Sequence, residues 1–134
     1  MLVVRRGHPL TKRTLTLRDF ASQRQVLVSP QGSWARQLGD ALHREGLSPT
    51  IALRTSQMKV AMDIVARTDY VTVLARRVAQ QMRGDFSVRL LPLPVATDGF
   101  TLALYWHERN HEDPLHRWFR GLVARLARQV YKRR

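Results

Sequence analysis

The stretch Gln25–Thr55, with the sequence QVLVSPQGSWARQLGDALHREGLSPTIALRT, decides the fold class of this chain. Its first part, Gln25–Ser29, is an apolar run of strand length. From Ser33 to Glu45, apolar residues recur at helical spacing, and Gly46 ends that pattern. Thr50–Thr55 is again a strand-like run with a β-branched, aliphatic centre. The stretch therefore predicts a strand, a helix and a second strand, in which the helix crosses over to make the two strands parallel.

The same alternation continues on both sides of this stretch. Helices are expected where apolar residues recur at helical spacing, and their starts are marked by capping residues such as Thr16 and Ser56. The further strands expected are Leu2–Arg5, Tyr70–Leu74, Ser87–Leu91 and Phe100–Trp106, and the further helices expected are Leu17–Ala21, Ser56–Ala66, Arg76–Met82 and a long one after Asp113–Pro114. This order predicts an α/β fold with a largely parallel sheet flanked by helices.

Length and composition indicate one soluble, globular domain. The chain has 134 residues, of which 44% are hydrophobic and 25% charged, so disorder is not expected. No apolar run approaches the roughly 18 residues that a membrane-spanning helix needs. The sequence has no cysteine, which excludes disulfides and cysteine-ligated metals and suits a cytoplasmic protein. We therefore predict a cytoplasmic location and no membrane partner.

The net charge of +13 indicates acidic partners. Such an excess of Lys and Arg is typical of proteins that bind nucleic acid, anionic lipid or small anions. The basic residues are spread along the chain, however, and several lie on the last helix beside an apolar stripe. That stripe comprises Leu115, Trp118, Phe119, Leu122, Val123, Leu126 and Val130. A helix of this kind can lie on a membrane, but we expect it to pack against the chain's own core. A free-standing basic module that binds nucleic acid or anionic membrane is the alternative hypothesis.

The stretch Trp106–Pro114, WHERNHEDP, contains the H-E-x-x-H spelling of zinc peptidases. That motif requires a helix, on which His107 and His111 would share a face. Here a predicted strand precedes the motif, and Asp113–Pro114 marks the start of the next helix. The motif therefore falls in a connection, so we expect neither a metal site nor any other cofactor. No acid–base pair or nucleophile motif stands out elsewhere, and catalysis is not predicted.

Two turns offer the chemistry of an anion site. In open α/β sheets, ligands bind beyond the carboxyl ends of the strands, where helix N-termini present free N–H groups. One turn is Ser29-Pro30-Gln31-Gly32-Ser33, and the other is Thr55-Ser56-Gln57. Each combines a hydroxyl group with the first amides of a helix, which suits a carboxylate. The alternative is that Ser33 and Ser56 only cap their helices.

Several phrases, in this order, resemble the second half of the effector-binding domain of LysR-type transcriptional regulators. These phrases are Val4–Leu10 (VRRGHPL), Leu15–Phe20 (LTLRDF), Val26–Gly32 (VLVSPQG), Ile64–Asp69 (IVARTD), Trp106–Arg109 (WHER), Asp113-Pro114 and Arg117–Arg120 (RWFR). Their order and spacing cover nearly the whole chain. In that family the WHER stretch and the helix after it bind no metal.

The resemblance implies a fold like a type 2 periplasmic binding protein, with two subdomains around an effector cleft. Residues 7–91 would form the second subdomain, while residues 1–6 and 95–134 would be the crossover and the C-terminal part of the first. The helix-turn-helix that binds DNA would be absent, so DNA binding by this chain would be non-specific. The expected partners are a small anionic effector and either a second copy or the missing subdomain. The resemblance places the effector near Thr55, Ser56, Gln57, Ser29, Gln31, Gly32, Ser33, Thr68 and Asp69.

Overall fold

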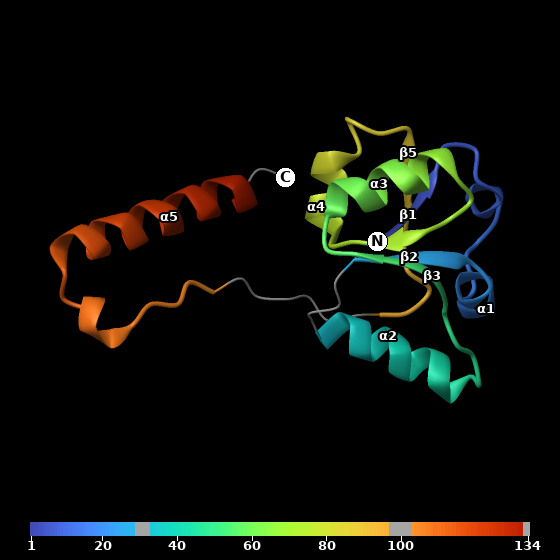
Figure 1. Cartoon of the computed structure of the whole chain (residues 1–134), viewed down its shortest axis with the longest axis horizontal. Helices are drawn as coiled ribbons and strands as arrows, with labels where there is room; N and C mark the ends of the chain where they lie inside the picture. Colours follow the sequence, from blue (N-terminus) through green and yellow to red (C-terminus); the bar gives the residue numbers. More distant parts are fainter. Residues whose placement is uncertain (29–32, 97–102, 133–134) are drawn as a thin grey trace. The chain divides into compact units, whose positions relative to one another are not determined.

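The computed structural model describes residues 1–28, 33–96 and 103–132, which belong to two units, Met1–Phe100 and Thr101–Arg134 (Figure 1). In the first unit, the strands are β1 (Leu2–Arg5), β2 (Arg24–Val28), β3 (Thr50–Thr55), β4 (Thr72–Val73) and β5 (Val88–Leu91), and the helices are η1 (Pro9–Lys12), α1 (Leu17–Ala21), α2 (Ser33–Arg44), α3 (Met58–Arg67) and α4 (Arg76–Met82). The second unit contains η2 (Glu108–Asn110) and α5 (Pro114–Lys132). None of the helices in these described ranges is long and apolar enough to cross a bilayer.

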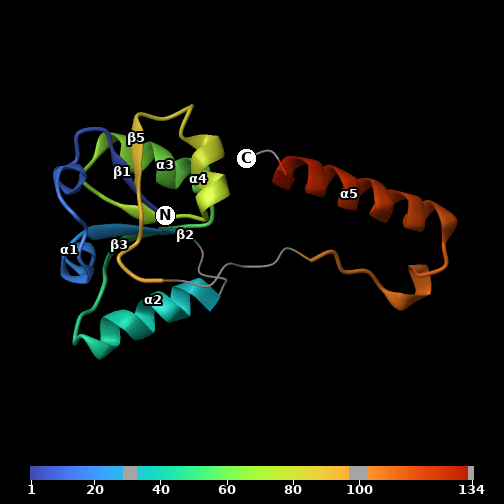
Figure 2. The same cartoon turned by 180° about the vertical axis from the view of Figure 1, so that it is seen from behind.

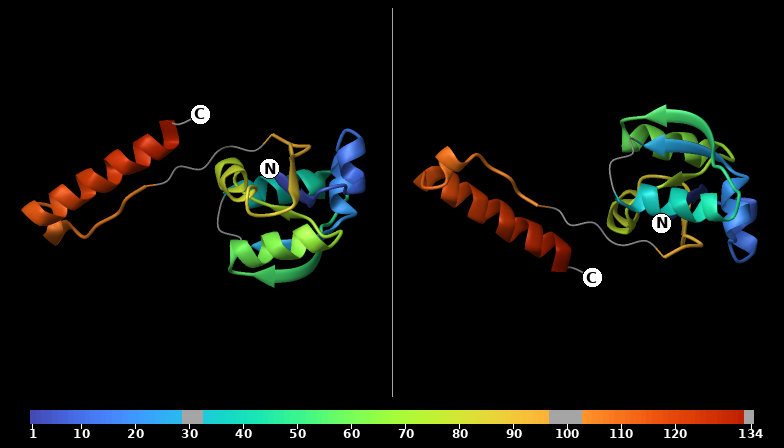
Figure 3. Two further views of the ribbon diagram at one scale, coloured as in Figure 1. Left: turned by 90° about the horizontal axis from the view of Figure 1, so that it is seen from above. Right: turned by 90° about the horizontal axis from the view of Figure 1, so that it is seen from below.

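The strands pair in the orders β4-β1-β5 and β2-β3, and a single parallel bridge between Gln25 and Val71 joins the two groups. Strand β1 is antiparallel to both of its neighbours, whereas β2 and β3 are parallel and lie side by side in Figure 3. The Val26 amide donates to the Val71 carbonyl over 2.8 Å, and the Val71 amide donates to Arg24 over 3.0 Å. Together these pairings mean that β1 is antiparallel to the other four strands.

The α/β class is confirmed, but the expectation of a largely parallel sheet is wrong, because antiparallel and parallel pairs are mixed. The alternation of strands and helices suggested that each strand pairs in parallel with the next. Instead, β1 lies between β4 and β5, two strands that come much later in the chain. Local sequence patterns reveal the period of an element but not its long-range neighbour.

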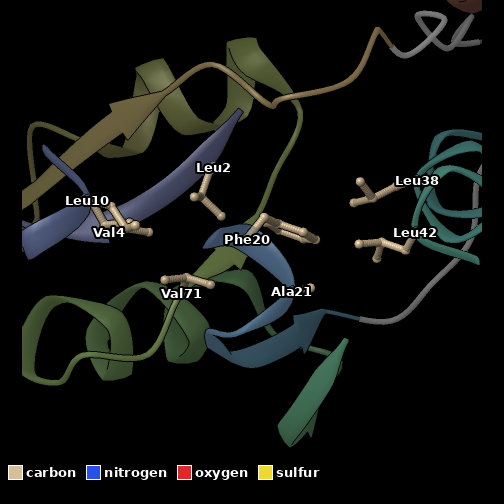
Figure 4. Close-up of a cluster of buried hydrophobic side chains, with 8 residues drawn as sticks. All are labelled: Leu2, Val4, Leu10, Phe20, Ala21, Leu38, Leu42 and Val71. Atoms are coloured by element: carbon tan, nitrogen blue, oxygen red, sulfur yellow. The ribbon is translucent and has the colours of Figure 1, made fainter. Parts of the chain in front are cut away.

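The core has two layers, one on each face of the sheet. Side chains alternate along a strand, so Leu2 and Val4 point to one face and Val3 to the other. The first cluster is Leu2, Val4, Leu10, Phe20, Ala21, Leu38, Leu42 and Val71 (Figure 4). The second cluster is Val3, Val26, Ala61, Met62, Val65, Leu74, Ala79 and Val88. Accordingly, α2 and α3 lie on opposite sides of β2 and β3, as Figure 2 shows.

The turn Gly7-His8-Pro9, which follows β1, is held in place by the buried side chain of His8. Gly7 takes a positive φ of 79°, which a residue without a Cβ adopts readily. His8 is buried, its Nδ1 accepts from the Leu10 amide over 3.2 Å, and its Nε2 lies 3.3 Å from the Asp69 carbonyl oxygen. The imidazole therefore caps η1 and ties it to the turn before β4.

Helix α1 begins with the cap that the sequence predicts. The Thr16 hydroxyl accepts from the Asp19 amide over 3.1 Å, and the Asp19 carboxylate accepts from the Thr16 amide over 3.1 Å. This reciprocal arrangement is a capping box. The hydrogen bonds from Thr16, followed by the nearby Arg13 guanidinium, lower the pKa of Asp19 below its ordinary value of 3.8.

The lowered pKa of Asp19 makes stability depend on pH at the acid end. A carboxyl with a depressed folded-state pKa contributes stability above its ordinary pKa and loses that contribution as pH falls through the folded value. Asp19→Asn is therefore expected to lower the urea midpoint at pH 7, with a smaller difference from wild type at pH 3. Asp40→Asn, on the exposed side of α2, is the control. An Asp19→Asn deficit of equal size at both pH values would contradict the capping role.

Two further sequence predictions about element ends fail. Ser56 does not cap α3, because the N-cap residue is Gln57, which makes no side-chain hydrogen bond to the helix. The predicted strand Phe100–Trp106 is also not found: residues 100–102 lie outside the described ranges, and Ala103–Trp106 form no strand. β-Branched and aromatic composition favours a strand only when a partner strand is available.

Helix α5 starts where Asp113 and Pro114 predict, and the Asp113 carboxylate accepts from the His116 amide over 2.8 Å. The second unit by itself does not cover the apolar stripe of this helix. The exposed members are Leu115 at 73%, Trp118 at 59%, Phe119 at 54%, Leu126 at 51% and Val130 at 65%. The helix is thus strongly amphipathic, and its own unit leaves much of its apolar face uncovered.

Candidate functional site

The carboxyl ends of β2 and β3 lie together at one edge of the sheet. Their parallel register places Val28, the last residue of β2, opposite Thr55, the last residue of β3. The chain continues from Thr55 directly into Ser56, Gln57 and then α3. From Val28 it continues through residues 29–32, which lie outside the described ranges, to α2 at Ser33. The two strands that precede the turns singled out in the sequence therefore end at the same edge of the sheet.

The Thr55–Gln57 turn presents polar groups at the start of α3. The Thr55 hydroxyl accepts from the Gln57 amide over 3.1 Å, which folds the turn, whereas Ser56 and Gln57 are exposed. The first amides of α3 have no side-chain cap, so they remain available to a ligand at the positive end of the helix dipole. Two exposed cations, Arg54 and Lys59, flank the turn in the chain. This chemistry suits a small anion.

The same edge also holds the start of β1 and the end of β5. Met1 precedes β1, and its backbone exchanges hydrogen bonds of 2.9 and 3.0 Å with Leu74, which directly follows β4. Leu2 also pairs with Leu91, the last residue of β5. The start of β1 and the end of β5 therefore lie at the same edge of the sheet as the carboxyl ends of the parallel strands.

Thr68 and Asp69 lie at the opposite edge. Val71 pairs with Gln25 near the start of β2, about 10 Å along the strand from Val28. The Asp69 carboxylate accepts from the Arg5 guanidinium at 2.7 Å. The Thr68 hydroxyl donates to the Ile64 carbonyl over 2.8 Å and accepts from the Tyr70 amide. These two residues hold the turn between α3 and β4, and the structure does not bring them to the other candidates.

Of the remaining candidates, Ser29, Gln31 and Gly32 lie outside the described residues, and Ser33 is the first residue of α2.

The first unit also has two open hollows that the sequence did not predict. One, of about 560 Å³, is lined by residues 13–15 and 91–96, and the other, of about 490 Å³, lies between α2 and Val95-Ala96. Neither hollow includes the Thr55–Gln57 turn. From the sequence, the proline-containing segment 92–94 was predicted only to connect two elements, and nothing in it indicated a hollow.

The H-E-x-x-H motif lies in a connection, as the sequence predicts. Glu108–Asn110 form a 3₁₀ turn, for which His107 is the N-cap and His111 the C-cap. His107 Nδ1 accepts from the Arg109 amide over 3.1 Å, and His111 Nδ1 accepts from the Trp106 indole over 3.3 Å. Across the described ranges, no group of three or more histidine, aspartate or glutamate side chains is placed to hold a metal ion.

Comparisons with known proteins agree on one family. Residues 1–128 match the family model described as LysR substrate binding domain. The HTH-type transcriptional regulator SyrM of Rhizobium meliloti (strain 1021) is 35% identical over 126 residues, which are 93% of this chain and 39% of the relative. The HTH-type transcriptional activator NahR of Pseudomonas putida is 29% identical over 122 residues, which are 91% of this chain and 41% of the relative. The chain thus spans about two fifths of the length of these curated relatives.

Among solved structures, the regulatory domain of MexT, a transcriptional activator in Pseudomonas aeruginosa, has the same fold. The TM-score is 0.77 at 24% identity, and the match covers 91% of this chain and 60% of the MexT chain.

Proposed function

Because the chain belongs to the LysR substrate-binding domain family, we propose that it is the effector-sensing part of a LysR-type transcriptional regulator. Members of this family are not enzymes, and neither is this chain. The observation that supports an effector site most directly is the uncapped start of α3 after the Thr55–Gln57 turn, at the edge where β2 and β3 end side by side.

The effector we propose is a small carboxylate. The Ser56 hydroxyl and the first amides of α3 would donate hydrogen bonds to its oxygen atoms, and the dipole of this ten-residue helix would favour its negative charge. Ser29, Gln31, Gly32 and Ser33, which follow β2 in the chain, remain candidates for the same ligand, because β2 ends beside β3. Thr68 and Asp69 are left out of this site, because they bind Ile64 and Arg5 at the other edge.

The proposed cleft lies between two subdomains of a fold like a type 2 periplasmic binding protein. Residues 7–91 would form the second subdomain, and residues 1–6 and 95–134 would belong to the crossover and the first. The division of contacts into Met1–Phe100 and Thr101–Arg134 supports a boundary after β5. The match to only 60% of the MexT regulatory domain fits a chain that carries part of such a two-subdomain fold.

Oligomerisation would use apolar surfaces that the chain leaves uncovered. The first unit exposes Leu53, Met58 and Val60 on β3 and α3, each by 40–44% of its surface. β3 is also the last strand in its pairing order, so one of its backbone edges is free within the described sheet. The apolar stripe of α5 is a second such surface. Either surface could pack against a second copy or against the other part of the regulator.

To test the effector site, thermal unfolding is measured with a panel of small aromatic and aliphatic carboxylates. A ligand that binds only the folded state raises the unfolding temperature, so we expect at least one aromatic carboxylate to do so. The rise should shrink in the Ser56→Ala/Gln57→Ala variant but not in Ser48→Ala, a matched change before the other end of β3. A rise that is equal in all three proteins would rule out the Thr55–Gln57 turn.

The competing hypothesis, a basic nucleic-acid-binding module, is tested with DNA. The matched region is a substrate-binding domain. Any DNA binding should therefore come from contacts between DNA phosphates and the basic side chains that give the chain its net charge of +13. We expect unrelated duplexes of equal length to bind alike, with an affinity that falls steeply between 50 and about 200 mM salt. Fluorescence anisotropy across a salt series measures both properties. Selection of one sequence at physiological salt would favour the competing hypothesis.

A further inference from the structure

The three histidines around η2 share one role that has nothing to do with metal. In each of His107, His111 and His116, the Nδ1 atom faces a hydrogen-bond donor: the Arg109 amide at 3.1 Å, the Trp106 indole at 3.3 Å and the Arg120 guanidinium at 3.0 Å, respectively. Amide, indole and guanidinium nitrogens carry hydrogen and only donate. Each Nδ1 must therefore accept, which requires a neutral imidazole with its proton on Nε2.

Arg120 closes this connection onto α5. Its guanidinium lies over the Trp106 ring, 4.4 Å from the centroid, and donates to the carbonyl oxygens of Asn110 over 2.9 Å and His111 over 2.8 Å. The rings of Trp106 and His111 stack with centroids 6.1 Å apart. We call Trp106, Asn110, His111, His116 and Arg120 the clasp. It joins a residue before η2 to one in the second turn of α5.

The charged neighbours of the two clasp imidazoles differ in sign. The Glu112 carboxylate lies 3.6 Å from His111 Nε2. Glu112 is shared with Arg117, whose guanidinium is also 3.6 Å away. His116 faces the Arg120 cation instead. The Asp113 carboxylate is engaged with the His116 amide at the start of α5.

From this geometry we propose that the clasp is a pH-sensitive latch, closed while His111 and His116 are neutral and opened when they take up protons. An imidazolium has hydrogen on both ring nitrogens and cannot accept from Trp106 or Arg120. Imidazoles ordinarily change charge between pH 5 and 8. Protonation of His111 releases the Trp106 indole, and a positive charge on His116 repels the Arg120 guanidinium.

Opening frees the connection between Trp106 and Asp113 from α5 while the helix itself stays folded. The helix cap survives because the Asp113 carboxylate accepts from a backbone amide of His116, not from its ring. The latch would therefore change how the chain enters α5, independently of any effector bound at the Thr55–Gln57 turn.

The latch is tested by NMR on the whole chain between pH 8 and 5. We expect the nuclear Overhauser contacts between the Trp106 ring and the Arg120 side chain to fall severalfold at pH 5, while circular dichroism shows that helix content is kept. His111→Asn/His116→Asn is the key variant, because the asparagine Oδ1 can accept at the Nδ1 position but does not titrate. Its contacts should persist at pH 5. His43→Asn, an exposed histidine of α2, should behave as wild type.

Two results would overturn the latch: contacts that survive at pH 5 in the wild type, or contacts that are lost at pH 5 in His111→Asn/His116→Asn as well.

Discussion

Phe20→Ala is expected to leave most of the chain unfolded at 37 °C. Phe20 is fully buried and packs with Leu2, Val4, Leu42 and Val71 in the first of the two core layers (Figure 4). Truncating a buried phenylalanine costs about 3–5 kcal/mol. That is a large share of the ~5–15 kcal/mol that holds a domain together. Urea denaturation followed by circular dichroism measures the loss.

Phe119→Ala is the matched control, because Phe119 is the same residue type but is 54% exposed on α5. It should change the urea midpoint of the first unit little. Equal losses for the two variants, or a Phe20→Ala protein as stable as wild type, would contradict the placement of Phe20 in the core.

Self-association is the second large effect that we expect. Burying a large apolar side chain is worth about 1.5–3 kcal/mol, and α5 leaves five of them exposed, Leu115, Trp118, Phe119, Leu126 and Val130. Several such contacts together are enough to drive association of two chains. Sedimentation and light scattering should therefore give a mass above that of one chain, increasing with protein concentration.

The variant Leu115→Gln/Phe119→Gln/Leu126→Gln should return the protein to a monomer, since it removes the centre of this apolar face. The comparison variant Leu53→Gln/Met58→Gln/Val60→Gln changes the exposed patch on β3 and α3 instead. If only the comparison variant becomes monomeric, association uses the β3 edge. A wild-type protein that stays monomeric at all concentrations would contradict both surfaces.

The elements that could be predicted from the sequence are those specified by local patterns. Gln25–Ser29, Ser33–Glu45 and Thr50–Thr55 predicted β2, α2 and β3 within one or two residues. The Thr16 cap and the Asp113 cap are also local, since a side chain and an amide three residues apart meet whenever a helix starts there.

The elements that could not be predicted depend on distant partners. The antiparallel pairing of β1 is set by β4 and β5, about 70 and 90 residues further along the chain. Phe100–Trp106 has the composition of a strand, yet Ala103–Trp106 form none, because no partner strand pairs with them in the described chain.

The candidate site likewise has parts that local sequence predicts and parts that depend on distant partners. The Thr55–Gln57 turn could be located because a polar turn after an apolar strand is a local signal. The position of Thr68 and Asp69 could not, because it depends on the bridge between Gln25 and Val71. The clasp was also missed: Arg120 meets Trp106 across fourteen residues, and no periodic pattern marks such a contact.

The central claim is that a small carboxylate binds at the carboxyl ends of β2 and β3. Backbone amide NMR during a titration with such a ligand tests it most directly. We predict that the amides of Ser56 and Gln57, at the start of α3, and those of Ser29 and residues 31–33 shift together and saturate at one ligand concentration. Amides near Thr68 and Asp69, at the opposite edge, should stay unchanged. Shifts confined to Pro114–Lys132, or centred on Thr68 and Asp69, would contradict it.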